Sequence, residues 1–461
     1  MVSQSGESGE SCVERWDRAR ARFAALDGGL RAVITWIESS RTVAEECDRR
    51  AAAGEPLGPL HGLLVGIKDN IDVAGVVTTA GAAFLSDNVA TADAGCIELL
   101  KAQGAVVIAK LNMAELAWGA TTQNATYGAC RNPWDTDRIP GGSSGGSGAA
   151  LAARMCEAAL GTDTGASVRV PAALNGVVGL RPTFGAISNR GVYPVAYTQD
   201  AVGPMAVLAS DAARLTEALI QHDPADPYSL AGAAMPATSL IGVPLDGVVF
   251  GVPESFFFDD LEQGVADRID GFMSWLKAQG GQLVPVADFG QAQAFEHWTR
   301  IVQSEGASLH EPRLGESPHH FSPDVHGRVS AGLDVRAVDL VRSLDWRQRY
   351  RHGLGQVFAE VDVIVTPVVP IDVPFAEGYD SRAQTQALGR ITYPWALHAG
   401  PTLTLPIGFN TDSDLPVGVA LSAAPWCEAR LFQVADAYQR DTTWHERLPG
   451  LVSALEEAPS E

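Results

Sequence analysis

Lys68 is the first residue in the sequence whose type and position could do chemistry. The chain has 461 residues but only four lysines, and Lys68 lies inside an apolar run, residues 63–71. Burial in apolar surroundings disfavours the charged form of lysine, so its pKa falls below the usual value of about 10.4. A neutral lysine can accept a proton. An ordinary strand-end lysine is the alternative, and it is weakened because Asp69 and Asn70 offer only local partners.

A glycine- and serine-rich segment, residues 140–148, is the most unusual stretch of the chain. It has the composition of a flexible linker, but both of its flanks are apolar and typical of a core. It lacks the Gly-Lys-Ser/Thr end of a phosphate loop and the preceding strand of a dinucleotide fingerprint. Residues 142–146 fit the G-x-S-x-G pattern around Ser144, but the strand that enters a nucleophile elbow is missing. The remaining interpretation is a rigid loop whose glycines allow close backbone approach.

A second loop of small residues, residues 160–171, carries Ser167 directly after Gly165 and Ala166. Several backbone N–H groups can converge near the Ser167 hydroxyl in such a loop, which is what an oxyanion hole requires. Taken alone, the pattern is more typical of a serine turn with a satisfied hydroxyl. The two loops and Lys68 therefore have to be considered together.

The elements that must position these residues alternate between strand and helix. Residues 63–71 and 105–109 are predicted to be short buried strands, and a helix is predicted between them over 93–103. Helical spacing also covers residues 13–55 and 149–159. Strand–helix–strand alternation of this kind indicates an α/β sheet.

The rest of the chain has a different pattern of predicted elements. Helical segments alternate with proline-rich connections from about residue 206, followed by three predicted strands and a helix that begins near Glu428. The predicted helices there are residues 212–221, 261–279, 292–306 and 335–358, and the strands are residues 361–370, 402–407 and 417–422. No period of 20–50 residues recurs, so a repeat architecture is excluded. We expect one large α/β unit with a helical insertion.

Composition limits the class of protein. The chain has 33 Lys plus Arg against 55 Asp plus Glu, a net charge of −22, and it is 46% hydrophobic, as an ordinary packed protein is. Because it has no basic surplus to neutralise phosphates, a nucleic-acid partner is not expected. No apolar run approaches 18 residues, so no membrane partner is expected, and six scattered cysteines favour reduced thiols and a cytoplasmic location. No ligand-like spacing is present, even near His319 and His320, so neither a metal nor a cofactor is expected.

Three motifs in order resemble the amidase signature family, whose members are serine hydrolases with a Ser–Ser–Lys triad. They are Gly66-Ile-Lys-Asp-Asn70, Gly141-Gly-Ser-Ser-Gly-Gly146 and Gly161-Thr-Asp-Thr-Gly-Ala-Ser-Val-Arg-Val-Pro171. The similarity continues through residues 176–183 and returns at residues 363–367 and 415–418. It is strongest over residues 56–205 and nearly absent over residues 206–360.

The resemblance implies roles for individual residues. Ser167 would be the nucleophile, Lys68 the neutral base and Ser143 the relay between them, entered through a cis peptide bond. The backbone N–H groups of Thr164, Gly165, Ala166 and Ser167 would form the oxyanion hole.

The resemblance also implies an architecture. All 461 residues would form one domain with a central mixed, twisted sheet flanked by helices. Residues 56–205 would be its catalytic motif region, residues 206–385 a variable helical insertion on the substrate side, and residues 386–461 a return to the core.

Three details refine this assignment. The family usually has glycine where this chain has Ala166, so we expect an altered hole with a methyl group near the acyl pocket. Arg169 and Asp163 are expected to form a buried pair that braces the loop, in preference to a substrate-binding role for Arg169. Lys110 also matches a family motif and is expected to be structural.

The acyl side of the pocket is expected to lie along residues 117–127. The substrate-binding candidates are Ala117, Trp118, Gln123, Tyr127 and Gly142. The remaining wall should come from residues 300–400, where Tyr393 and His398 either face the site or pack in the core.

Three functions compete. The leading prediction is an amidase that hydrolyses C–N bonds of small aryl or alkyl amides, with carbamates and esters as related substrates and a homodimer as one option. The alternative is the glutaminase-like A subunit of a tRNA-dependent amidotransferase. A non-catalytic scaffold should have lost triad residues, and none is lost.

Overall fold

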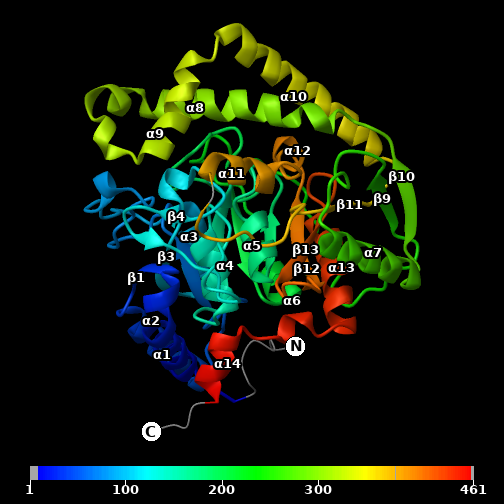
Figure 1. Ribbon diagram of the computed structural model, residues 1–461. Helices are drawn as coiled ribbons and strands as arrows, with labels where there is room; N and C mark the ends of the chain where they lie inside the picture. The colour runs from blue at the N-terminus through cyan, green and yellow to red at the C-terminus, as the bar shows by residue number, and fades with distance from the viewer. Residues whose placement is uncertain (1–8, 379, 458–461) are drawn as a thin grey trace.

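One large mixed sheet runs through the residues that the computed structural model describes, 9–378 and 380–457 (Figure 1). Within that part of the chain, 11 strands pair in the order β1-β3-β2-β6-β8-β7-β12-β13-β11-β9-β10, and β4 pairs with β5 apart from it. The strands are β1 Val33–Trp36, β2 Leu64–Lys68, β3 Val106–Leu111, β4 Gln123–Asn124, β5 Gly128–Ala129, β6 Ala158–Asp163, β7 Val178–Arg181, β8 Ala201–Ala206, β9 Val249–Pro253, β10 Gln282–Val286, β11 Val363–Pro367, β12 Thr402–Phe409 and β13 Pro416–Ser422. The predicted α/β class is confirmed.

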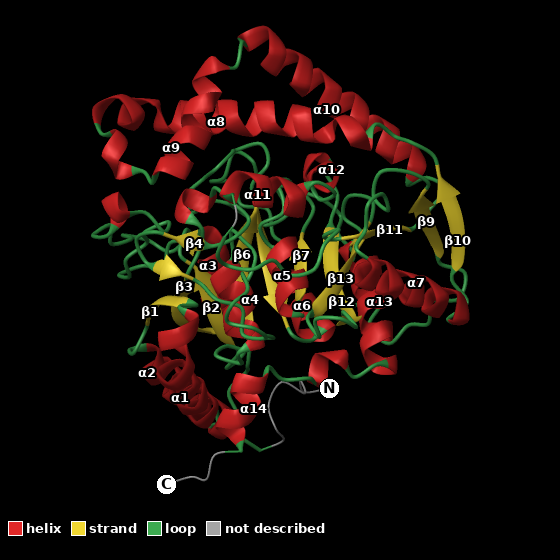
Figure 2. Cartoon of the chain, in the orientation of Figure 1, coloured by secondary structure: helices red, strands yellow, loops and turns green. Residues whose placement is uncertain are grey.

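Helices cover both faces of the sheet, and a further helical layer lies over one edge (Figure 2). The helices are α1 Cys12–Leu30, α2 Ser40–Ala52, α3 Gly95–Ala102, α4 Gly145–Ala152, α5 Arg169–Asn175, α6 Ala209–Leu219, α7 Gln263–Ala278, α8 Ala294–Glu316, α9 Pro323–Ser330, α10 Ala337–Val357, α11 Ser381–Gly389, α12 Tyr393–Leu397, α13 Glu428–Asp441 and α14 Gly450–Glu456. Apolar side chains of α6, α7 and α13 pack on one face, and those of α1, α2 and α4 pack on the other. Both faces of the central strands are therefore shielded from solvent.

Strands β2 and β6 bring the two ends of the candidate site together. They are parallel neighbours, with Ile67 opposite Leu160, so their carboxyl ends meet at the same edge of the sheet. Ile67 packs into the cluster that α3 and α6 complete. Because successive side chains alternate between faces, Lys68 points to the opposite face, where α4 lies.

Helix α4 begins directly after Ser143 and Ser144, and its glycines explain how closely it approaches the sheet. A Cβ atom on Gly146 would lie 2.4 Å from the carbonyl oxygen of Asn112. The prediction of a helix over 149–159 was wrong at both ends, since α4 spans Gly145–Ala152. The alanines at 158 and 159 belong to β6 because β2 and β8 enclose them on both sides, which overrides their helical propensity.

Two other expectations are corrected by short strands. The helical stretch predicted over 13–55 is divided by β1, because α1 ends at Arg31 in a left-handed conformation (φ 50°) and the chain then pairs with β3. The range 206–385 is not helical throughout. The strand predicted at 361–370 is β11, and β9 and β10 also lie in this range and extend the sheet at its edge. The helices α8, α9 and α10 form the layer at the top of Figure 1.

Candidate active site

Lys68 lies at the end of β2 and contacts two hydroxyl groups. Its Nζ lies 2.6 Å from Ser143 Oγ and 2.7 Å from Thr162 Oγ1, and Asn70 Nδ2 donates to the same threonine oxygen at 3.1 Å. Lys68, Ser143 and Thr162 are all buried. The structure thus brings together the lysine and the first serine of the predicted triad.

The surroundings of Lys68 favour its neutral form. Desolvation lowers the pKa of Lys68 to about 7, although the negative charges of Asp163 and Asp200 oppose this. Neither carboxylate forms an ion pair with Lys68 in the described part of the chain, so the ammonium form lacks a direct counter-charge. A substantial fraction of Lys68 can therefore accept a proton near neutral pH.

The glycine–serine loop delivers Ser143 through a cis peptide bond between Gly142 and Ser143, as the resemblance predicted. Ser144 has a different part. Its backbone N–H donates to the carbonyl oxygen of Ser167 at 3.1 Å, and its hydroxyl donates to the carbonyl oxygen of Thr162 at 3.2 Å. Ser144 therefore ties the two loops together. Among the described residues no hydrogen bond joins Ser143 Oγ to Ser167 Oγ, and such bonds are often long before substrate binds.

A buried charge network fixes the loop that bears Ser167. Arg169 donates to Asp163 through Nε at 3.0 Å and Nη2 at 2.9 Å, and Arg181 Nη1 lies 3.3 Å from the same carboxylate. Burial opposes ionisation of Asp163, but the two guanidinium groups outweigh it and lower its pKa to about 2. Asp163 also accepts the N–H of Val168. The bracing role expected for Arg169 is confirmed, and its side chain is not available to a substrate.

The backbone around Ser167 has the donors that an oxyanion hole needs. Within the described chain, the N–H groups of Gly165, Ala166 and Ser167 donate to no protein acceptor. Ala166 is not among the residues with positive φ, so alanine fits this position without backbone strain. Gly165 is required for a different reason, because a Cβ there would lie 2.6 Å from the Trp298 ring.

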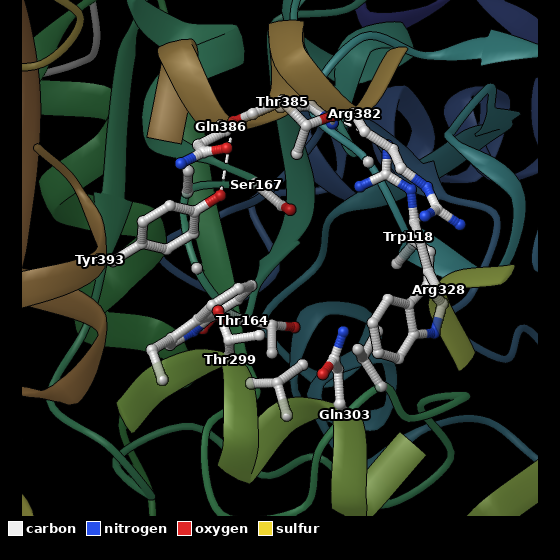
Figure 3. A pocket seen from close by; sticks show the side chains of 18 of the residues that line it. Trp118, Thr164, Ser167, Thr299, Gln303, Arg328, Arg382, Thr385, Gln386 and Tyr393 are labelled. Atoms are coloured by element: carbon white, nitrogen blue, oxygen red, sulfur yellow. Dashed lines mark hydrogen bonds between the residues drawn. The ribbon is translucent and has the colours of Figure 1, made fainter. Parts of the chain in front are cut away.

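A cavity of about 220 Å³ opens over Ser167, and we call it the main cavity (Figure 3). The Ser167 hydroxyl points into it. Loop residues 117–120 and 164–167 form one side, α8 forms another, and α9, α11 and α12 complete it. The polar side chains that line it, besides those of the loops, are Thr299, Gln303, Arg328, Arg382, Thr385, Gln386 and Tyr393.

The predicted substrate residues divide into two groups. Ala117 and Trp118 line the main cavity, as Tyr393 also does. Gln123 does not, since its Nε2 is committed to the carbonyl oxygens of Thr121 and Cys130 at 3.1 Å. Tyr127 interacts with Thr79, away from the cavity.

Two further candidates are placed in the interior. Gly142 is packed against the backbone of residues 120–122. His398 packs in the core, with Nε2 2.9 Å from the carbonyl oxygen of Ala423.

Two kinds of residue escaped the sequence analysis. Thr162 could have been found, because the parallel pairing of β2 with β6 places it at the same end of the sheet as Lys68. The wall residues of α8, α9 and α11 could not, since no local motif marks them and only the tertiary fold brings them over Ser167.

Metal clusters and membrane-spanning helices are both absent from the part of the chain that the structure describes. Among those residues, no group of three or more His, Cys, Asp or Glu side chains could hold a metal ion. None of the helices there combines the length and the apolar character that a bilayer-spanning segment needs.

Comparison with known proteins defines the class. The family model described as Amidase matches residues 17–432, and the chain belongs to this family. It is therefore a hydrolase that acts on carbon–nitrogen bonds other than peptide bonds, and a Ser–Ser–Lys triad is characteristic of this family.

Individual relatives cover almost the whole chain. The A subunit of the glutamyl-tRNA(Gln) amidotransferase of Chloroflexus aggregans is 35% identical, over 96% of this chain and 96% of its own. AtzE, which is a subunit of the 1-carboxybiuret hydrolase of Pseudomonas sp., is 36% identical over 92% of this chain and 93% of its own length. A solved structure from a study of a vestigial protein complex and the origins of an s-triazine catabolic enzyme is 34% identical in sequence. It superposes with a TM-score of 0.88 and covers 94% of this chain and 95% of its own.

Proposed function

We propose that this enzyme hydrolyses the C–N bond of a small amide, with Ser167 as nucleophile, Ser143 as proton relay and Lys68 as base. The observation that carries the proposal is the 2.6 Å contact between Lys68 Nζ and Ser143 Oγ, fully buried beside the loop that presents Ser167 to the main cavity. A serine hydroxyl becomes nucleophilic only when a base takes its proton. Neutral Lys68 supplies that base, and Ser143 spans the distance.

The reaction proceeds in two halves. Ser167 Oγ attacks the amide carbonyl carbon while its proton passes through Ser143 to Lys68, and the N–H groups of residues 165–167 receive the developing oxyanion. Ser143 then returns a proton to the leaving nitrogen, the C–N bond breaks, and the acyl group stays on Ser167. Water attacks the ester along the same proton route, which releases the acid and restores the serine.

The cavity wall refines the class of substrate. Trp118, Phe295, Trp298 and Val302 give it apolar surfaces suited to the predicted aryl or alkyl group. Arg328 and Arg382 add positive charge at one side (Figure 3), only partly neutralised by Asp324, whose Oδ1 lies 3.0 Å from Arg328 Nε and 3.6 Å from Arg382 Nε. An amide that also carries a carboxylate fits this combination. The name of the relative 1-carboxybiuret hydrolase supports it.

A panel of amides with an active-site variant tests the proposal. We expect carboxylated aryl or alkyl amides to be cleaved faster than their uncharged analogues. The matching carbamates and esters are included in the panel as related acyl donors. Ser167→Ala should lower kcat by about 10⁴-fold or more and abolish covalent labelling by a fluorophosphonate. Wild-type turnover by Ser167→Ala at unchanged stability would refute the assignment.

The A subunit of a tRNA-dependent amidotransferase remains the second candidate, because many relatives carry that name. Glutamine has an ammonium group as well as a carboxylate, and no Asp or Glu is among the residues that line the main cavity in the described chain. We therefore expect little ammonia from free glutamine when the chain is tested alone. Rapid glutamine hydrolysis that requires added partner subunits would favour this second function and would exclude an independent homodimer.

A further inference from the structure

Asp200 lies behind the oxyanion loop and bonds directly to it. Its Oδ1 accepts the Thr164 hydroxyl at 2.5 Å, and its Oδ2 accepts the backbone N–H groups of Val195 at 2.8 Å and Ala196 at 3.1 Å. Thr164 and Val195 both line the main cavity. One carboxylate therefore joins two segments of the cavity wall from outside.

Thr164 is held from a second direction. Trp298, on α8, donates from Nε1 to the carbonyl oxygen of Thr164 at 3.0 Å. The three following residues carry the unpaired N–H groups of the oxyanion loop. The orientation of Thr164 thus sets where these donors point, and its hydroxyl has Asp200 as its acceptor.

We propose that Asp200 is a positioning residue of the hydrolytic site, which fixes the oxyanion loop through the Thr164 hydroxyl. This inference rests on the proposed function, because it requires Ser167 to be the nucleophile. Oxyanion donors accelerate acyl transfer only when they are fixed before the charge develops. A hydrogen bond to a charged carboxylate is stronger and shorter than a neutral one, which suits this purpose.

The carboxylate is nearly buried but reaches a second hollow. We call this the rear cavity; Asp200, Asp226, Arg190 and Tyr197 are among the residues that line it. Burial raises the pKa of Asp200 to about 6, although the bonds from Thr164, Val195 and Ala196 oppose this. Other charged or titratable groups that act on Asp200 or respond to it are Glu305 on α8, Arg181 on β7, Lys68 on β2 and Tyr197. Arg190 is already paired with Glu98 and Asp223.

The charge of Asp200 also gives the proposal a readout that a purely structural role would not move. A negative charge near Lys68 favours its ammonium form. Removal of that charge should let Lys68 lose its proton at lower pH. The acid limb of kcat/KM should then move to lower pH in Asp200→Asn.

Four variants test the proposal. Thr164→Val removes the hydroxyl at nearly constant volume and should lower kcat about 10-fold or more with KM changed by less than about 3-fold, as for a lost transition-state donor. Thr164→Ser keeps the hydroxyl and should recover most of that loss. Asp200→Asn should lower kcat and shift the acid limb. Asp226→Asn, a neutralised carboxylate of the same cavity without a bond to the loop, should leave both unchanged.

Each outcome decides the matter. The proposal would be overturned if Thr164→Val kept the wild-type kcat, or if Thr164→Val and Thr164→Ser lost equal activity. It would also be overturned if the acid limb of kcat/KM stayed in place in Asp200→Asn, or if it moved equally in Asp226→Asn. Thermal unfolding of every variant separates misfolding from mispositioning. Fluorophosphonate labelling of the wild type and Ser167→Ala tests the nucleophile independently, so a failure of the proposed function is distinguished from a failure of this inference.

Discussion

Lys68 and Lys110 lie on neighbouring parallel strands and are equally buried, yet one contacts uncharged groups and the other contacts a carboxylate. Lys110 lies opposite Ile67 in the β2–β3 register and forms an ion pair with Asp69 at 2.9 Å, supported by Thr78 Oγ1 at 2.8 Å. Lys68 contacts hydroxyl groups instead. Burial lowers the pKa of both lysines and nearby carboxylates favour the charged form of both, but of the two only Lys110 is in direct ion-pair contact with a carboxylate in the described chain.

The comparison shows that burial alone does not make a lysine a base. The same desolvation leaves a lysine in an ion pair where a carboxylate is in contact, and it favours the neutral form proposed for Lys68, where only uncharged oxygen atoms are in contact. Lys110 is thus the structural residue that the sequence analysis expected, and the difference from Lys68 can be tested at both positions.

The largest effect is expected at Lys68. Lys68→Met keeps the volume but removes the base, so kcat/KM should fall by about 10³- to 10⁴-fold. Hydrolysis of a cleavable amide measures the loss, and circular dichroism with thermal unfolding shows whether the fold is intact. Near-normal turnover would remove Lys68 from the mechanism.

Lys110→Met should damage stability more than chemistry. It leaves the Asp69 carboxylate buried without its counter-charge, which should lower the free energy of unfolding by about 3–5 kcal/mol. Denaturant unfolding measures this, and Lys110→Met combined with Asp69→Asn should restore much of it. If Lys110→Met were fully stable but as inactive as Lys68→Met, the distinction between the two lysines would be wrong.

The pH dependence is the mildest test. Because protonated Lys68 cannot act as a base, kcat/KM should rise about tenfold per pH unit below its pKa of about 7 and level off above it. Unfolding should show the linked effect. The unfolded chain keeps this lysine protonated up to about 10.4, so the stability of the wild type relative to Lys68→Met should increase from pH 7 to 10. A rate limb near pH 10 would place a charged, inactive lysine in the site.

The proposed catalytic residues could be predicted from the sequence better than the residues of the pocket. Lys68, Ser143 and Ser167 could be singled out because each lies in a short motif whose local chemistry is unusual. Gln303, Arg328 and Arg382 could not, because helices more than 100 residues away bring them over Ser167. Gln123 and Tyr127 were misplaced for a related reason, since the fold turns the chain away from the cavity after residues 117–120.

Short strands were the weakest part of the fold prediction. β1, β9 and β10 have 4 or 5 residues each, and their pairing with distant strands, more than their own composition, defines them. Strands β12 and β13 are longer and completely buried. Because complete burial requires a continuous apolar run, both could be recognised in the sequence.

The contact between Gly165 and Trp298 limits how this enzyme can change its specificity. Trp298 belongs to the helix that forms a wall of the main cavity, but its ring fills the space that a side chain at 165 would need, and its indole N–H secures Thr164. Exchange of α8 for a helix from another amidase would therefore alter the shape of the pocket and the alignment of the oxyanion donors in one step. Designed or natural recombination at this helix should succeed only where an aromatic donor at position 298 is inherited with it.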